Sequence, residues 1–357
     1  MDSPLSAAPA PLTLVHSASA QPVERTALGL WRERALAVWT GGGAPREQQR
    51  RGLAEIMFGE VACHPHAVCE ATPAERAAVT FSDAGAASQS ELAEAALREL
   101  LAGLDAPTLK RCKLALYGTA SVDDHFFRST LSGLAASHGF SAVPHFGLAQ
   151  LQGATLAAAA EVAEAMLTAD GEAALLLAVD TWPLPQPRQW DTLAPLGDGA
   201  TALWLVRAEQ PGLQFIGARQ ASFEPFVQVS AGAAVPIVDH EALFEAASQT
   251  LAGGLQELGV EPSDLGVWLD SGLSAAQALG IDARLRERVG ALDAESVAPA
   301  PDEGYLCAAA APALLGQVLA RSCAGALPNG TLVLCWGASL GGGVGMSLWR
   351  VYAPMEN

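Results

Sequence analysis

The sequence predicts an α/β protein in which buried strands alternate with helices, and three observations support this prediction. Short segments such as 172–182, "EAALLLAVDTW", are almost wholly apolar, as strands covered on both faces are. Segments with helical spacing separate them, and the clearest is 88–106, for which Ser90 is the expected N-cap. Hydrophobic residues make up 50% of the 357-residue chain and charged residues 16%, which is enough for a dry core.

The elements of the first half follow one another in a regular order. Residues 1–20 are rich in Pro, Ala and Ser, so we expect them to be loose or to form a first edge strand. Residues 25–39 have a helical period that "TGGGAP" ends. The remaining elements expected here are the helix 88–106, a strand at 113–120, a helix at 123–139, a strand at 142–149 with a helix after it, the strand 172–182, a long loop with prolines, and a strand at 198–209.

The second half repeats this rhythm and suggests an internal duplication. We therefore divide the chain into an N-terminal half, 1–209, and a C-terminal half, 210–357. "AALLLAVDTW" (173–182) and "TLVLCWGASL" (331–340) are the expected equivalent core strands. The other elements expected in this half are strands at 212–223 and 265–272, helices at 240–259 and 311–327, a helix ending near "RVGALD", and a hairpin with a Gly-rich turn at 330–351.

Charge and cysteine use restrict the partners and the compartment. A net charge of −18 repels nucleic acid and anionic membranes. The one obvious basic cluster, with Arg46, Arg50 and Arg51, is either a solvated helix start or a docking patch for an acidic carrier protein. The start lacks a signal-peptide pattern, no apolar run is long enough to span a bilayer, and the six cysteines form no CxxC pair. These features predict a cytoplasmic protein with reduced thiols.

One short stretch raises the question of a metal. "CHPHAVC" brings Cys63, His64, His66 and Cys69 close together in sequence, which fits either a structural zinc site or a polar surface loop. Pro65 interrupts the stretch and no second cluster of ligands follows. We therefore predict no metal.

Several stretches, taken in order, resemble the ketosynthase III (β-ketoacyl-ACP synthase III) family of the thiolase superfamily. The helix and strand at 91–121, the segment "LGDGATALWLV" (196–206) and the hairpin "WGASLGGGVGMSLWR" (336–350) carry the resemblance. It implies a five-layer αβαβα sandwich of two related halves, usually a dimer. It also implies acyl-CoA or acyl-carrier protein as substrate, no cofactor, and a place in fatty-acid or polyketide-type secondary metabolism. The scaffold residues of the two glycine motifs are Gly197, Asp198, Gly199, Gly341, Gly342 and Gly343.

The resemblance implies that all three positions of the family's Cys-His-Asn triad have changed. The family's "C-x-G" pattern at the start of a buried helix matches through Gly153, which puts Leu151 at the cysteine. Counting along "DLGVWLDSGLSA" puts Ser271 at the histidine. Gly304 keeps the glycine of the family's Gly-Asn-Thr-Ser segment, and Tyr305 then stands at the asparagine. Leucine has no nucleophile, and a serine hydroxyl does not replace an imidazole at neutral pH.

Two fallback residues keep other chemistries open. A register shifted by one residue puts Gln152 at the cysteine's place, and in related decarboxylating domains an amide there holds an enolate. Cys307 is either a displaced thiol or a small buried hydrophobe before an Ala-rich helix.

Aromatic residues in the first half raise a further possibility for a partner. Phe126 and Phe127 occupy the region from which a family aromatic reaches into the partner's acyl site, or they pack an ordinary helix. Trp31 and Arg32 resemble the Trp and Arg that family members use to hold coenzyme A.

The resemblance implies two functions of different kinds. The first is a non-catalytic subunit, a pseudoenzyme, that pairs with an intact ketosynthase III homologue or with itself. The alternative is an active acyltransferase or condensing enzyme that uses an unusual nucleophile.

Overall fold

Ten strands of the described chain form one sheet that is built from two half-sheets. The computed structural model describes residues 9–45, 47–52, 80–85, 87–121, 129–184, 188, 194–228, 237–269, 273–290, 292–300 and 302–353. The two half-sheets meet where β1 (Leu12–Ala20) pairs with β8 (Gly212–Ser222) over a short antiparallel stretch.

The two half-sheets have the same topology. The first has the order β1-β7-β6-β4-β5, in which the first two pairs are antiparallel and the last two are parallel. The second has the order β8-β14-β13-β11-β12 with the same directions. Their remaining strands are β4 (Cys112–Thr119), β5 (His145–Ala149), β6 (Ala173–Asp180), β7 (Gly199–Arg207), β11 (Leu265–Leu269), β12 (Glu295–Val297), β13 (Leu332–Ala338) and β14 (Gly343–Tyr352).

The expected equivalent core strands hold matching places in this arrangement. β6 and β13 are each the third strand of their half-sheet and are buried along their whole length. The chain passes from one half-sheet to the other between β7 and β8. The division of the chain into two domain halves at residue 209 stays a prediction.

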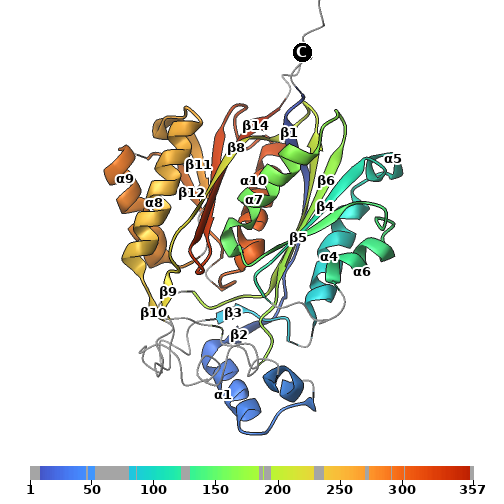
Figure 1. The fold of residues 1–357 in the computed structure, drawn as a ribbon, viewed down its shortest axis with the longest axis vertical. Helices are drawn as coiled ribbons and strands as arrows, with labels where there is room; N and C mark the ends of the chain where they lie inside the picture. The colour runs from blue at the N-terminus through green and yellow to red at the C-terminus, as the bar shows by residue number, and fades with distance from the viewer. Residues whose placement is uncertain are drawn as a thin grey trace, which may run out of the picture.

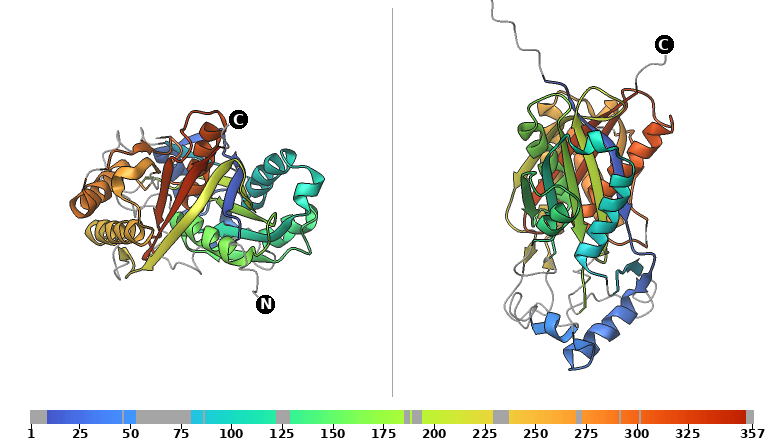
Figure 2. Two further views of the ribbon diagram at one scale, coloured as in Figure 1. Left: turned by 90° about the horizontal axis from the view of Figure 1, so that it is seen from above. Right: turned by 90° about the vertical axis from the view of Figure 1, so that its right-hand side faces the viewer.

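Helices complete five layers, as the resemblance implied (Figures 1 and 2). α7 (Thr155–Met166) and α10 (Ala310–Cys323) lie between the half-sheets and contact strands of both. α4 (Gln89–Ala102), α5 (Ala106–Leu109) and α6 (Thr130–Ser137) lie on the outer side of the first half-sheet, and α8 (His240–Glu257) and α9 (Ala275–Val289) on that of the second.

A small cap lies at one end of the sandwich (Figure 1). It contains α1 (Leu28–Trp39) and the paired strands β2 (Arg25–Ala27) and β3 (Thr80–Ser82). Trp31 is buried there against Leu28 and Phe81, so its ring is core rather than an exposed surface for coenzyme A. The other short elements are β9 (Val227–Gln228), β10 (Ile237–Val238) and the 3-10 turns η1 (Gln152–Ala154), η2 (Pro262–Asp264) and η3 (Cys307–Ala309).

Two local predictions from the sequence are wrong. Residues 12–20 form no loose start or edge strand, because β1 lies between β7 and β8 with Leu12 and Leu14 fully buried. The N-cap of α4 is Ser88 rather than Ser90, since Ser88 and Glu91 form a capping box. The sequence offered two serines at suitable spacing, and the reciprocal hydrogen bonds select the earlier one.

The Gly-rich hairpin forms as expected between β13 and β14. Of the three glycine positions in its turn, only the middle one requires a glycine. Gly342 has φ +99°, and a Cβ there would lie 2.3 Å from the Phe223 carbonyl oxygen. Around Gly341 and Gly343 a Cβ would meet only ordinary contacts with Ser339.

Some expectations fall outside the described residues, namely the 63–69 stretch, Arg46, Phe126, Phe127 and Ser271. Arg50 and Arg51 lie in a helical stretch. Within the described ranges, no group of three metal-ligating side chains is found. A search of the same ranges finds no helix with the length and apolar character needed to cross a bilayer.

Candidate functional site

The centre of the molecule contains two similar turns, one from each half. η1 begins α7 and η3 begins α10, and the two turns contact each other. Their first residues, Gln152 and Cys307, have φ values of +45° and +48°. Among the described residues other than glycine, the only further positive φ belongs to Gln150, two residues before Gln152. Such backbone strain away from glycine marks turns that present a side chain at a site.

The Tyr305 side chain closes the first turn from the second half. Its hydroxyl accepts a hydrogen bond from Gly153 N–H at 3.0 Å and donates to the Ala338 carbonyl oxygen at 3.1 Å. A Cβ on Gly153 would lie 2.9 Å from this hydroxyl and 3.0 Å from Gly337 Cα, so only glycine allows the approach. Burial raises the pKa of Tyr305 well above its usual value, and the phenol therefore stays neutral.

Gln152 makes the second internal contact at this turn. Its side-chain carbonyl oxygen accepts from Leu340 N–H in the β13–β14 hairpin at 2.9 Å. The neighbouring Ser339 hydroxyl donates to the Gln150 carbonyl oxygen at 2.9 Å. The start of α7 and the Gly-rich hairpin are thus joined by side chains of this chain.

A buried carboxylate serves the second turn. Asp180, at the end of β6, accepts from Ala308 N–H at 2.8 Å through one oxygen. The other oxygen accepts from the backbone N–H groups of Ala120 and Ser121 and from the Thr119 hydroxyl, at 2.7, 2.6 and 3.1 Å. Complete burial raises the pKa of Asp180 to about 6, although these hydrogen bonds oppose the shift.

Cys307 stands at the tip of the second turn but is a poor nucleophile there. Its side chain is fully buried. Burial, with a smaller contribution from the charge of Asp180, raises the pKa of the Cys307 thiol well above its usual value. Because the thiolate is the reactive form, this environment keeps Cys307 unreactive.

The backbone of Tyr305 is fixed by the glycine motif that precedes β7. Tyr305 N–H donates to the Pro195 carbonyl oxygen at 2.8 Å, and Gly197 N–H donates to the Tyr305 carbonyl oxygen at 3.0 Å. A Cβ on Gly197 would meet the Glu303 carbonyl oxygen at 2.1 Å, and one on Gly304 would meet that of Pro195 at 2.5 Å. These two glycines therefore permit the close contact that places Tyr305.

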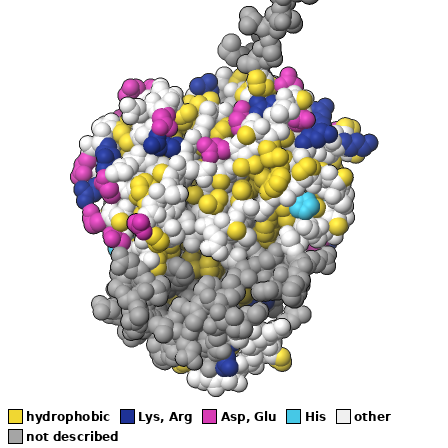
Figure 3. Space-filling view, viewed as in Figure 1, with side chains coloured by type: hydrophobic (Ala, Val, Ile, Leu, Met, Phe, Trp, Pro, Cys, Tyr) yellow, Lys and Arg dark blue, Asp and Glu magenta, His cyan; other side chains and the backbone are white. Residues whose placement is uncertain are grey.

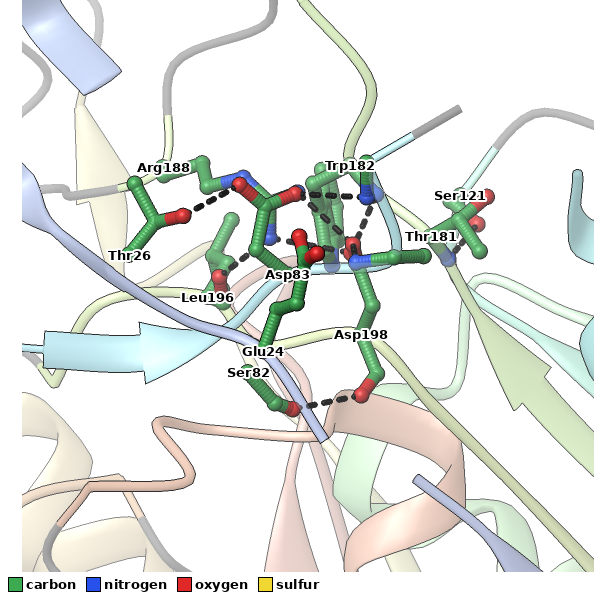
Figure 4. A network of polar contacts seen from close by, with 12 residues as sticks. Glu24, Thr26, Ser82, Asp83, Ser121, Thr181, Trp182, Arg188, Leu196 and Asp198 are labelled. Atoms are coloured by element: carbon green, nitrogen blue, oxygen red, sulfur yellow. Dashed lines mark hydrogen bonds and ion pairs between the residues drawn. The ribbon is translucent and has the colours of Figure 1, made fainter. Parts of the chain in front are cut away.

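A buried ion network connects this region to the cap (Figure 4). Arg188 makes two hydrogen bonds to Asp198, at 2.7 and 2.9 Å, and lies 3.4 Å from Asp83. Its guanidinium also lies over the Phe81 ring. Burial raises the pKa of Asp83, but the Thr26 hydrogen bond and the Arg188 charge hold it below its usual value. Asp198 of the glycine motif is therefore a structural anchor between β7 and the cap.

An exposed apolar patch lies over β5 and α7, and α7 also contains the partly exposed Glu161 and Glu164. β5 is the end strand of the sheet, and among the described strands only β4 pairs with it. Phe146 is 46% exposed and Met166 43%, with Leu148, Leu151 and Val162 partly exposed. Figure 3 shows hydrophobic side chains gathered over the middle of this face, with charged side chains toward its margins.

The structure brings together most of the residues that the sequence singled out. Leu151, Gln152 and Gly153 lie at the first turn, and Tyr305 and Cys307 lie beside it. Ser271 lies outside the described residues.

Asp180 and Arg188 were not predicted as site residues from the sequence. Asp180 had a usable signal, since it is a lone charge ending an otherwise apolar strand segment. Arg188 lies in a proline-bearing loop, where no local pattern reveals burial.

Comparison with known proteins identifies the fold. No family model matches the sequence, and no curated protein matches it either. Solved structures do match. The 3-oxoacyl-(acyl carrier protein) synthase III FabH from Pseudomonas aeruginosa PAO1 is 21% identical, with 96% of this chain and 99% of that one covered and a TM-score of 0.61.

Two further structures give the same result. A variant of OleA from Xanthomonas campestris is 17% identical, with 96% and 98% covered and a TM-score of 0.66. AbyA1, a tetronic acid condensing enzyme, is 20% identical, with 95% and 99% covered and a TM-score of 0.65. The chain therefore has the thiolase-like fold of ketosynthase III-type condensing enzymes. A shared fold does not by itself assign an activity.

Proposed function

We propose that this chain is a ketosynthase III-like subunit that forms no acyl-enzyme and pairs with an intact ketosynthase III homologue. The observation that carries the proposal is the first central turn, where Leu151 and Gln152 stand and the adjacent Gly153 N–H is held by Tyr305. Neither leucine nor glutamine can form an acyl-enzyme.

Two registers are compatible with this proposal. Matching through Gly153 puts Leu151 at the family's cysteine. The backbone supports Gln152 instead, because Gln152 and Cys307 are the first residues of equivalent turns and share a positive φ. A nucleophile on a strained turn at a helix start is a known arrangement in hydrolases. Of the two candidate positions, Gln152 has a positive φ and Leu151 does not. In both registers the reactive thiol is missing.

The apolar face on β5 and α7 supports pairing with another chain. An open sheet edge with exposed apolar side chains and no lysine or proline within the strand tends to pair. Each copy of this chain carries a net charge of −18, so two copies would repel each other. We therefore propose an unlike, less acidic thiolase-fold partner, with a second copy of this chain as the alternative.

Co-expression with intact ketosynthase III chains tests the pairing. We expect native mass spectrometry to show a mixed dimer, which Phe146→Asp weakens by at least about ten-fold by placing a charge in an apolar interface. Leu279→Asp is the matched control, because Leu279 is 70% exposed on α9 and remote from β5. A chain that purifies as a stable homodimer and binds none of the candidates contradicts the proposal.

A second candidate, an acyltransferase that uses Cys307, is favoured by one observation. Cys307 occupies the same place in its turn as Gln152 does in the first. Mass spectrometry after incubation with acyl-CoA would then show an adduct that Cys307→Ala abolishes. If no adduct forms, the burial and raised pKa of the Cys307 thiol explain why it does not react.

A further inference from the structure

The first central turn is occupied by side chains of the chain itself, and this deepens the function proposed above. Two backbone N–H groups lie beside Gln152, one on Gly153 and one on Leu340. Each already has a side-chain acceptor, the Tyr305 hydroxyl at 3.0 Å and the Gln152 amide oxygen at 2.9 Å. Paired backbone N–H groups of this kind stabilise developing oxyanions in acyl transfer when they are free.

We propose that Tyr305 and Gln152 form an internal closure of the central turn, so that restoring a thiol alone does not restore a reactive centre. The chain then forms no acyl-enzyme for two separate reasons. It lacks the nucleophile, and its own side chains occupy the donors that would support one. This inference rests on the proposed function and adds a structural reason why no acyl-enzyme forms.

Tyr305 is suited to this role by its anchoring. Its backbone is held on both sides by Pro195 and Gly197, and its ring is fully buried. Its hydroxyl reaches from the second half to the helix start of the first, where it both accepts and donates. Moving the phenol aside would break both hydrogen bonds at once and leave Gly153 N–H and Ala338 C=O buried without partners.

Gln152 is suited to its role by its chemistry. The amide oxygen of glutamine is a planar carbonyl acceptor, as a thioester carbonyl oxygen is. By accepting from Leu340 N–H, it takes the hydrogen bond that an incoming acyl group could otherwise make.

The experiment compares the reactivity of an introduced thiol with and without Tyr305. The two chains are Gln152→Cys and Gln152→Cys with Tyr305→Asn, which places the residue that the family has at this position. Both are treated with iodoacetamide, and alkylation is followed by peptide-resolved mass spectrometry. Cys323 is exposed in the same chain and serves as the internal rate reference.

We expect the introduced thiol to react at least about ten-fold faster in the double variant, because the freed N–H favours the thiolate and the removed ring admits the reagent. Equal rates in the two chains overturn the closure.

Leu151→Cys in both backgrounds tests the register. We expect its rate to change by less than about two-fold on replacing Tyr305, since its thiol would lie before the strained turn. A large gain at Leu151→Cys with none at Gln152→Cys would overturn the part assigned to Gln152.

A gentler variant keeps the test decisive if the double variant does not fold. Tyr305→Phe retains the ring and removes only the hydroxyl. In Gln152→Cys with Tyr305→Phe, Gly153 N–H is free to donate to a thiolate, and we expect the pH profile of alkylation to shift to lower pH than in Gln152→Cys. An unshifted profile overturns the closure. The proposed function itself fails on different evidence, an acyl adduct or absent pairing in the unaltered chain.

Discussion

The two central turns share one backbone geometry but satisfy it with different chemistry. At the second turn, the N–H of Ala308 meets a fully buried carboxylate, Asp180. At the first, the equivalent N–H of Gly153 meets a neutral phenol, Tyr305. The difference follows from the strands behind the turns, since β6 ends in Asp180 whereas β13 ends in Ala338, whose carbonyl oxygen accepts from that phenol.

Under the proposed function, the chain keeps the architecture of the fold while its central turns form no acyl-enzyme. The turn that faces the carboxylate contains the only cysteine of the two turns, and the charge of Asp180 works against the thiolate of Cys307. The turn that faces the neutral acceptor, Gln152–Ala154, contains no thiol. Under the proposed function, the first turn lacks a nucleophile and the second holds its thiol in the uncharged form.

The largest expected effect is on the second turn, where Asp180 is the acceptor. Asp180→Ala leaves three backbone N–H groups without their acceptor, that of Ala308 buried and those of Ala120 and Ser121 part-buried, and we expect it to lower the free energy of unfolding by about 4 kcal/mol. Urea denaturation measures the loss. Glu241→Gln, which removes one charge of a surface ion pair, is the control and should cost under about 0.5 kcal/mol. Similar losses in both variants would refute the role of Asp180.

Removing the Tyr305 hydroxyl oxygen tests the first turn, whose acceptor is neutral. Tyr305→Phe leaves Gly153 N–H and Ala338 C=O unpaired, and we expect the free energy of unfolding to fall by about 2 kcal/mol. Tyr352→Phe removes a hydroxyl that bonds the exposed Glu209 and should change stability by less than about 0.5 kcal/mol. Should the two variants be equally stable, the hydrogen bonds of Tyr305 contribute nothing.

A smaller expected effect is a pH dependence of stability that arises from Asp180 at the second turn and not from Tyr305 at the first. In the folded chain the pKa of Asp180 is about 6, above its ordinary value of 3.8. The protonated form therefore stabilises the fold at low pH, and this contribution is lost as the pH rises through 6.

Between about pH 5 and pH 7, the wild type should lose about 1 kcal/mol of stability relative to Asp180→Asn, which has no titration here. Tyr305→Phe should show the same pH dependence as the wild type. A constant difference between wild type and Asp180→Asn across this range would show that the carboxyl is not shifted.

Local patterns in the sequence predicted the strands and helices well, because apolar runs and helical spacing survive at low identity. The helix at 88–106 and the strand at 113–120 correspond closely to α4 and β4. The interior place of β1 was missed, since pairing with both β7 and β8 depends on strands far away in sequence.

The site was predicted less completely than the fold. The turn at Gly153 and the neighbourhood of Tyr305 were found through the glycine motifs. The hydrogen bond between them spans 152 residues, and neither the positive φ of Gln152 nor the burial of Arg188 has a local signature. Such contacts are set by packing of the two halves, which no window of the sequence contains.

Native alkylation of the unaltered chain tests most directly the claim that its central turns present no nucleophile. Cys307 and Cys323 lie in the same molecule, one fully buried at the second turn and the other exposed at the end of α10. We predict that iodoacetamide labels Cys323 at least about a hundred-fold faster than Cys307, because burial suppresses both access and the thiolate. Labelling of Cys307 as fast as that of Cys323 would contradict the account.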